Sequence, residues 1–402
     1  MQTKKQASEY LRPEHVRDVH ATKPNGHARD VHAISSNVNT TKYNVREITF
    51  AQALYEATDY CLTNDPQVFV MGLGVDDPKG IFGTTLDLHK KHGEHRVFDV
   101  PVSELALTGI AVGAATMGMR PILTHQRLDF ALLSLDQIIN NAAKWHYMFG
   151  GIHKAPITIR MVIGRGWGQG PQHSQSHQAL FAHIPGLKVV MPTTAHDAKG
   201  LLISSIEDNN PVLFLEHRWL HFSKGHVPTE AYREPLSKCN VVREGKDLTI
   251  VAISYMVLEA YRVAEVLSQY GIEVEVIDLR TLKPFDGNTI LESVQKTGRA
   301  LVADTGHLTC GMSAEILAYI SENVFSSLKS APRRVALPDA PTPTSSVLAQ
   351  AYYPRSQELA KIALEVLGKQ NTATYKQVLT ELKAVEDKTP SDVPDFNFTG
   401  PF

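Results

Sequence analysis

Short, almost continuously apolar segments alternate with longer segments of helical apolar spacing over most of this 402-residue chain. Strands that are apolar on both faces are typical of a parallel sheet covered by helices on both sides. The predicted strands are 68–73, 96–99, 121–123, 156–163, 187–191, 212–216, 248–253, 273–277, 300–303 and 334–336. The predicted helices are 49–62, 105–117, 134–145, 195–207, 257–270, 290–297, 313–321 and 356–367. This order predicts an α/β fold with two mostly parallel-sheet domains.

Polar segments precede, separate and follow the two α/β units. Residues 1–44 are polar and rich in histidine, and they predict a flexible N-terminal extension. The first unit is expected at 45–222 and the second at 247–368, and a charged, proline-containing linker at 223–246 joins them. Residues 369–402 are again polar and predict a C-terminal extension that lies over the surface or over a partner.

Charge and cysteine usage argue against several classes of function. The 40 Lys and Arg residues nearly cancel the 42 Asp and Glu residues, which gives no reason to expect nucleic acid or membrane binding. Cys61, Cys239 and Cys310 are too few and too scattered for a disulfide framework. No apolar run approaches the roughly 20 residues that span a bilayer, and the amino terminus lacks the apolar core of a secretion signal. We expect a cytoplasmic protein, with a mitochondrial or plastid matrix as the alternative.

A lone carboxylate, Glu104, ends the run Val-Pro-Val-Ser-Glu at 100–104. It lies where a predicted strand passes into a predicted helix, among apolar neighbours. Such a position suits proton transfer. From the spacing alone, an ordinary solvated or helix-capping glutamate is the commoner alternative.

A glycine-rich segment at 164–170 leads into the sequence Gln-His-Ser-Gln at 172–175. Glycine lets a loop approach a ligand closely, and a histidine beside such a loop is a candidate general acid or base. That histidine is His173, and an ordinary surface-loop histidine is the alternative. Neither α/β unit opens with a Walker loop or a dinucleotide fingerprint, so the sequence does not support NAD binding.

Seven motifs follow one another in a characteristic order between residues 45 and 368. They occupy 100–104, 109–115, 136–144, 164–176, 185–190, 197–201 and 208–212. Together they strongly resemble the β subunit of the decarboxylating component of 2-oxo acid dehydrogenase complexes, a group that includes the pyruvate, branched-chain and acetoin enzymes. The resemblance implies a thiamin-diphosphate pyrimidine-binding domain followed by a transketolase C-terminal-like domain.

The resemblance also implies an active site. Glu104 matches the carboxylate that pairs with the aminopyrimidine ring of thiamin diphosphate, and His173 matches a histidine that assists acyl transfer. Val102, Gln126 and Phe130 match cofactor-lining positions. The implied reaction is decarboxylation of a 2-oxo acid and transfer of the acyl group to a lipoyl acceptor. The alternative is a two-subunit, transketolase-like carboligase that passes a two-carbon or acyl unit to an aldehyde or another non-lipoyl acceptor.

The superfamily's magnesium motif, Gly-Asp-Gly closed by Asn-Asn further along, is absent from this chain. The magnesium ligands are therefore expected from an α subunit that carries the motif, in an α2β2 heterotetramer that shares the thiamin diphosphate. A lipoyl acyltransferase is a further expected partner. Some relatives bind a structural potassium ion near Ile206, Asp208 and Asn210, where a plain helix-ending turn is the alternative.

His125, Arg127 and Asp129 depart from the pattern of better-known members of the family. They add polar groups just before Phe130. We expect one of two roles. They are substrate-side groups for an unusual or larger, polar acyl donor or acceptor, or they face the subunit interface.

Overall fold

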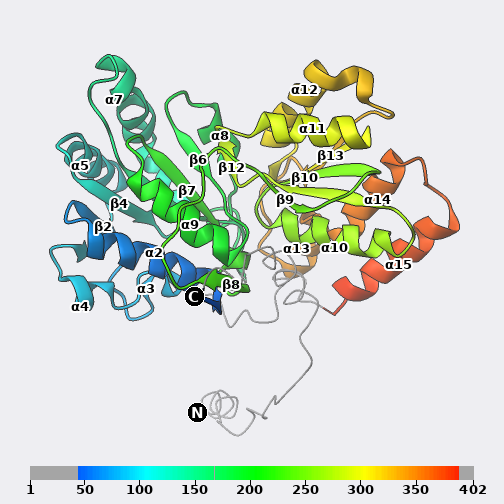
Figure 1. The fold of residues 1–402 in the computed structure, drawn as a ribbon. Coiled ribbons are helices and arrows are strands. Elements are labelled where there is room, and N and C mark those ends of the chain that lie inside the picture. Colours follow the sequence, from blue (N-terminus) through cyan, green and yellow to red (C-terminus); the bar gives the residue numbers. More distant parts are fainter. Residues whose placement is uncertain (1–43, 167, 389–402) are drawn as a thin grey trace, which may run out of the picture.

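The computed structural model describes residues 44–166 and 168–388, which form two α/β domains side by side (Figure 1). A seven-stranded sheet of order β12-β6-β7-β5-β4-β2-β3 forms the first domain. Its strands are β2 (Val68–Gly72), β3 (Val97–Phe98), β4 (Arg120–His125), β5 (Thr158–Ile163), β6 (Lys188–Val190), β7 (Val212–His217) and β12 (Thr281–Lys283). All neighbouring pairs are parallel except β12, which joins β6 antiparallel from a later part of the chain.

The second domain has a five-stranded sheet of order β14-β13-β10-β11-β9. Its strands are β9 (Asn240–Arg243), β10 (Leu248–Ala252), β11 (Val274–Asp278), β13 (Ala300–His307) and β14 (Arg333–Leu337). Only the edge strand β9 is antiparallel to its neighbour. The structure therefore confirms the predicted α/β class with mostly parallel sheets.

Helices cover both faces of each sheet, as continuously apolar strands require. One hydrophobic core contains α2 (Phe50–Asn64) and α9 (Ala195–Glu207) of the first domain and α10 (Met256–Ser268) and α14 (Ser356–Val366) of the second. The other contains α5 (Glu104–Thr116), α11 (Gly287–Thr297) and α12 (Met312–Val324). Each core continues from one domain into the other, which fixes how the two domains pack.

Short elements and one further long helix complete the fold. The short ones are β1 (Val45–Thr49), α3 (Gly80–Gly83), α4 (Leu88–His92), α6 (Leu128–Ala131), α7 (Ala143–Met148), α8 (Gln178–His183), β8 (Lys224–Pro228) and α13 (Ser346–Tyr352), and the long helix is α15 (Ala373–Glu386). A π-helix at Gln137–Ala142 interrupts the helix predicted at 134–145. An inserted π-helix leaves apolar periodicity nearly intact, so the sequence pattern did not reveal it.

The segment expected to be a linker, 223–246, is more ordered than predicted. Its strand β8 pairs with β1, and its strand β9 extends the sheet of the second domain. Strand β8 belongs to a two-stranded sheet and β9 is an edge strand, and both carry polar side chains facing outward. They therefore lack the apolar run that identified the central strands.

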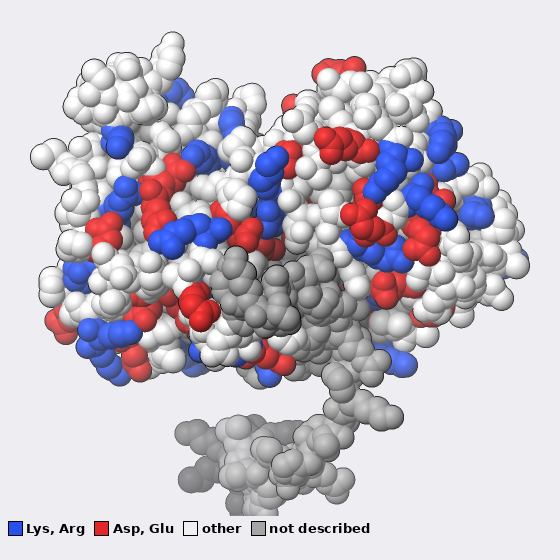
Figure 2. All heavy atoms as spheres, viewed as in Figure 1, with Lys and Arg blue, Asp and Glu red and all other residues white. Residues whose placement is uncertain are grey.

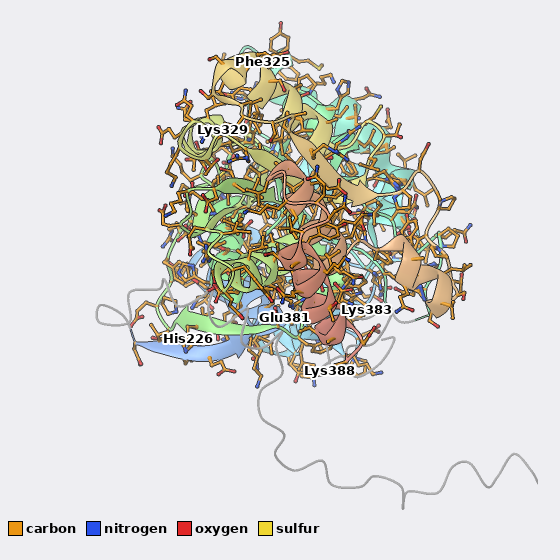
Figure 3. The ribbon with its side chains drawn as sticks, turned by 90° about the vertical axis from the view of Figure 1, so that its right-hand side faces the viewer. His226, Phe325, Lys329, Glu381, Lys383 and Lys388 are labelled. Atoms are coloured by element: carbon orange, nitrogen blue, oxygen red, sulfur yellow. The ribbon has the colours of Figure 1, made fainter. Side chains whose placement is uncertain are left out.

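The C-terminal extension begins with an ordered helix. Helix α15 packs against α14 and α10 and fully buries Val378 and Leu382. Figure 3 faces this side of the second domain and labels Glu381, Lys383 and Lys388 on and just beyond α15. The N-terminal extension lies outside the described residues, apart from its last residue.

Positive and negative side chains are interspersed on the face shown in Figure 2, in keeping with the nearly balanced composition. All three cysteines are free thiols. Among the helices at 44–388, none is both long and apolar enough to cross a bilayer.

Candidate functional site

The candidate residues lie at or just after the carboxyl ends of three strands of the first sheet. The chain leaves β3 and reaches Glu104, the first residue of α5. Strand β4 ends at His125, and β5 ends where the glycine-rich loop begins at Gly164. Because β3, β2, β4 and β5 are parallel neighbours, their carboxyl ends open on the same side, where α/β folds bind ligands.

One cavity unites most of the predicted site. Its lining includes Val102, Glu104, His125, Gln126 and Phe130, and it opens to solvent, with about 370 Å³ of empty space when the open mouth is counted. A Cβ atom added to Gly72 would lie 2.3 Å from the carbonyl oxygen of Thr124. Only glycine therefore allows β2 and β4 this close approach at the cavity wall. The Gln126 side chain donates from Nε2 to the Leu73 carbonyl at 3.1 Å, which holds the two strand ends together.

Glu104 lies at the protein surface, where it lines the cavity, and its side chain is half-buried. Apolar side chains around it are open to solvent: Val102 is 74% exposed, Leu105 47% and Ile110 61%. Contiguous exposed apolar side chains mark surfaces that a partner covers. The carboxylate is thus placed where a second chain would complete its surroundings.

His173 lies next to this cavity. Its ring meets Phe130 edge to face, with ring centroids 5.3 Å apart. Phe130 also lines the cavity together with Glu104. This one aromatic side chain therefore connects the cavity of Glu104 with the ring of His173. The structure therefore brings the neighbourhoods of Glu104 and His173 together although the two residues lie far apart in the sequence.

His125 enters the cavity as a neutral group. It is buried, and burial lowers its pKa to about 4. Its Nε2 atom has no hydrogen-bond partner within the described part of the chain, and a buried polar atom of this kind is costly unless a ligand satisfies it. A carboxylate, an amide, an aromatic ring and a neutral imidazole in one apolar cavity fit the aminopyrimidine ring of thiamin diphosphate, which has both donors and acceptors.

Arg127 and Asp129 are not among the residues that line this cavity. Arg127 is buried and donates to the Gly164 carbonyl, and Asp129 accepts a hydrogen bond from Gln175. Both therefore reach the loop that carries His173, a contact that neither predicted role included. Only a knowledge of the loop's path could have revealed it.

The predicted potassium residues meet at the end of α9, where side-chain cations already bind oxygens of Ile206 and Asp208. Arg120 donates to the carbonyls of Ile206 and Asp208 at 3.0 and 2.9 Å. Lys188 pairs with the Asp208 carboxylate, whose other oxygen accepts from the Asn210 backbone N–H at 2.8 Å. These bonds form the helix-ending turn that is the alternative, and the potassium site stays a prediction.

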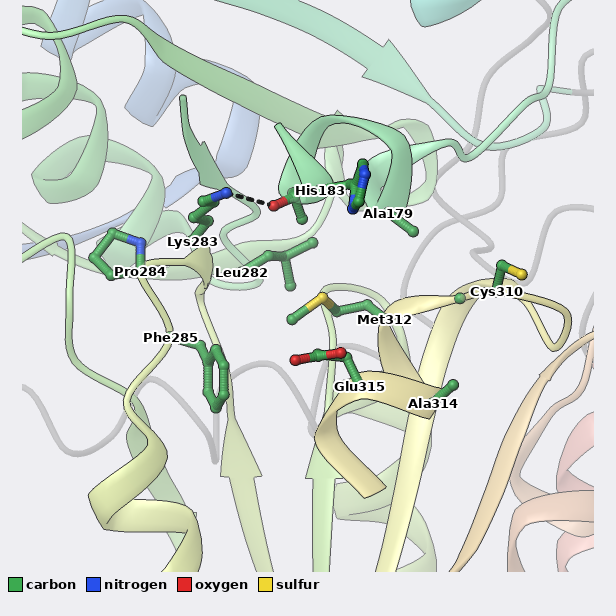
Figure 4. A pocket seen from close by; sticks show the side chains of 12 residues that line it. Ala179, His183, Leu282, Lys283, Pro284, Phe285, Cys310, Met312, Ala314 and Glu315 are labelled. Atoms are coloured by element: carbon green, nitrogen blue, oxygen red, sulfur yellow. Dashed lines mark hydrogen bonds between the residues drawn. The ribbon is translucent and has the colours of Figure 1, made fainter. Parts of the chain in front are cut away.

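A larger cavity lies away from this site, with about 950 Å³ of empty space (Figure 4). It lies between α8, the turn after β12 and the start of α12, and Leu282, Phe285 and Met312 form much of its wall. Its lysine, Lys283, donates to the carbonyls of Ala182 and Ile184. Because Lys283 is already bonded to the backbone, we do not assign this cavity as the reactive site on its size alone.

Acid should destabilise the chain through three buried histidines. Burial lowers the pKa of His125 to about 4, that of His217 to about 3 and that of His221 to about 4, from an ordinary 6.5. Below pH 6.5 these histidines are protonated in the unfolded chain but stay neutral in the folded chain. Stability is therefore intact above pH 6.5 and falls towards pH 4, by about 1.4 kcal/mol per pH unit for each histidine. Denaturant unfolding from pH 7 to 4.5 measures this slope.

A matched pair of variants isolates the effect of one buried histidine. His125→Phe should make the slope shallower, whereas the same measurement on His183→Gln, at an exposed position, should leave it unchanged. Equal slopes for both variants would contradict the assignment.

Two domain families match the chain. The "Transketolase, pyrimidine binding domain" matches residues 46–221, and the "Transketolase, C-terminal domain" matches residues 237–359. The β subunit of acetoin:2,6-dichlorophenolindophenol oxidoreductase from Cupriavidus necator is 43% identical over 80% of this chain and 98% of its own length. The β-1 subunit of the mitochondrial pyruvate dehydrogenase E1 component from Arabidopsis thaliana is 40% identical over 79% and 88%.

The fold is also similar to that of a solved structure described as a split gene transketolase, an inactive β4 tetramer. The TM-score is 0.66 and the identity 23%, and the match covers 81% of this chain and all of that one.

Proposed function

The chain belongs to the family of transketolase-like β subunits that includes those of acetoin and pyruvate dehydrogenases, and we propose that it acts as one. In this proposal it is the β-type subunit of a thiamin-diphosphate enzyme that decarboxylates a 2-oxo acid and transfers the acyl group to a lipoyl acceptor. Relatives of this kind favour oxidative acyl transfer over the carboligase alternative.

The observation that carries the proposal is the convergence of Glu104, Gln126 and Phe130 on one cavity beside His173. When bound, thiamin diphosphate supplies the nucleophilic carbon and the electron sink for decarboxylation. Glu104 would hold a proton at the ring nitrogen of the aminopyrimidine, which suits general acid–base work.

The other side chains of the cavity would orient the cofactor and exclude water. Phe130 offers an aromatic surface, and Gln126 keeps the strand ends closed through its bond to Leu73. The neutral imidazole of His125 can accept or donate a hydrogen bond without adding charge. His173, exposed beside Phe130, is placed to act on the substrate's reacting end.

An α subunit would complete the site. The apolar rim at Val102, Leu105 and Ile110 supports a partner at this position. We assign the Gly-Asp-Gly magnesium motif and the diphosphate site to that subunit, in an α2β2 heterotetramer, and we place a lipoyl acyltransferase beside it. The compartment stays a prediction: the cytoplasm, or an organelle matrix.

The isolated chain should bind thiamin diphosphate and magnesium weakly, because it provides one side of the site. Adding the α subunit should tighten binding by at least about tenfold, equivalent to about 1.4 kcal/mol. Isothermal titration calorimetry of the chain, of the α subunit and of the complex makes the comparison. Tight, magnesium-dependent binding to this chain alone would contradict the shared site.

A further inference from the structure

We infer that Arg127 and Asp129 are positioning residues that hold the His173-bearing loop, residues 164–166 and 168–177 of the described chain, beside the Glu104 cavity. The inference rests on the proposed function, in which Glu104 and His173 serve one bound substrate. The sequence suggested that these side chains face a substrate or a partner. In this inference they hold the loop instead, because their hydrogen bonds go to it.

Arg127 fixes the first half of the loop. Its guanidinium donates from Nη1 to the Gly164 carbonyl at 2.8 Å and from Nη2 to the Gln169 side chain. The same Gln169 oxygen accepts the backbone N–H of Gly166 at 2.9 Å. Arg127 is 3% exposed, and although burial lowers its pKa to about 10, it remains a cation at neutral pH. A planar fork of donors explains why a buried arginine holds several loop acceptors.

Asp129 fixes the second half of the loop. Its Oδ1 atom accepts from Gln175 Nε2 at 2.7 Å and from the Gln175 backbone N–H at 3.4 Å. The Gln175 side-chain oxygen in turn contacts the ring of His177. A carboxylate acceptor makes such bonds stronger than a neutral one would.

These two anchors bracket His173. Gln169 lies four residues before it and Gln175 two residues after it, and Phe130 contacts its ring between them. Arg127 directly follows Gln126 and precedes α6, and Asp129 and Phe130 lie within α6. One short segment therefore lines the Glu104 cavity and also sets the position of His173.

The second domain also supports the loop. Arg165 donates to the carbonyls of Pro343 and Thr344 at 2.8 and 2.7 Å. A Cβ atom on Gly170 would lie 2.3 Å from Thr344 Oγ1, so the loop backbone is in close contact there. Because both domains hold the loop, it is preorganised, and a shift of about 1 Å in a positioned group can cost roughly 10²-fold in rate.

The test compares Asp129→Ala, Asp129→Asn and Gln175→Ala in the assembled α/β complex. Asp129→Ala and Gln175→Ala should each lower kcat by roughly 10²-fold with little change in KM. The double variant should be no worse than either single variant, because both remove the same contact. Asp129→Asn should retain most of the activity, since its amide oxygen still accepts from Gln175.

Hydrogen–deuterium exchange supplies a second readout. In Asp129→Ala, exchange should speed up in the peptide 164–177 and stay unchanged in the core strands. Arg120→Met is the matched control, because Arg120 also donates to a turn, but at the opposite end of β4. It should lower the melting temperature without slowing turnover.

Turnover at the wild-type rate by both Asp129→Ala and Gln175→Ala would overturn the positioning role. So would an Asp129→Asn variant as slow as Asp129→Ala, because the acceptor geometry is kept in it. If Asp129→Ala fails to fold, Gln175→Ala tests the same contact from the loop side. An active Glu104→Gln variant would defeat the proposed function instead, so the two failures are distinguishable.

Discussion

Replacing Glu104 by glutamine should abolish most of the turnover of the α/β complex. The change keeps the size and polarity of the side chain but removes its ability to exchange a proton. Loss of one acid–base group typically costs about 10²–10⁴-fold, and we expect kcat to fall within that range. Steady-state assays of 2-oxo acid decarboxylation with an artificial electron acceptor measure the loss.

An exposed carboxylate outside the cavity provides the control for this prediction. Glu94 is exposed and precedes β3, the strand whose far end leads to Glu104. Glu94→Gln changes charge in the same way outside the cavity, so turnover should stay within about twofold of the wild type. Equal losses in both variants would mean that charge at the surface, rather than proton transfer in the cavity, governs the rate.

The largest effect on stability should come from Glu216, a buried carboxylate on β7. Glu216 and Arg160 are almost fully buried on the adjacent strands β7 and β5, with hydrogen bonds of 2.6 and 3.1 Å. Burial alone would raise the pKa of Glu216, but Arg160 and His221 lower it to about 2. Glu216→Gln leaves the Arg160 cation buried without its counter-charge, which should cost about 3–5 kcal/mol. Equilibrium denaturant unfolding gives the value.

A surface pair and a double variant bracket that value. The Arg233–Glu207 pair is about half exposed on both sides, so Glu207→Gln should cost at most about 1 kcal/mol. The double variant Arg160→Met, Glu216→Leu should recover much of the stability lost in Glu216→Gln, because neither charge of this pair stays buried. A loss below 1 kcal/mol in Glu216→Gln would refute the account of this pair.

Apolar runs and caps made much of the fold predictable. Helix α9 begins and ends where the sequence predicts, because Thr194 caps its start and the Asp208 turn ends it. Edge elements were not predictable in this way. Strand β12 joins the first sheet from beyond β11, so its pairing depends on how the two domains pack.

The candidate site was predictable as far as its motifs extend. The resemblance selected Glu104, Gln126 and Phe130, and the parallel strand order explains why they meet. Contacts made by loops escaped prediction. The bonds from Arg127 and Asp129 to the glycine-rich loop depend on a backbone path that glycine leaves open.

The proton-transfer role of Glu104 is tested most directly on the cofactor itself. The measurement is the rate at which the thiazolium C2 proton of thiamin diphosphate, bound to the α/β complex, exchanges with deuterium. We predict that Glu104→Gln slows this exchange by at least the roughly 10²-fold expected for kcat, while Glu94→Gln exchanges at the wild-type rate. Unchanged exchange in Glu104→Gln, with the cofactor bound as tightly as in the wild type, would contradict the assignment.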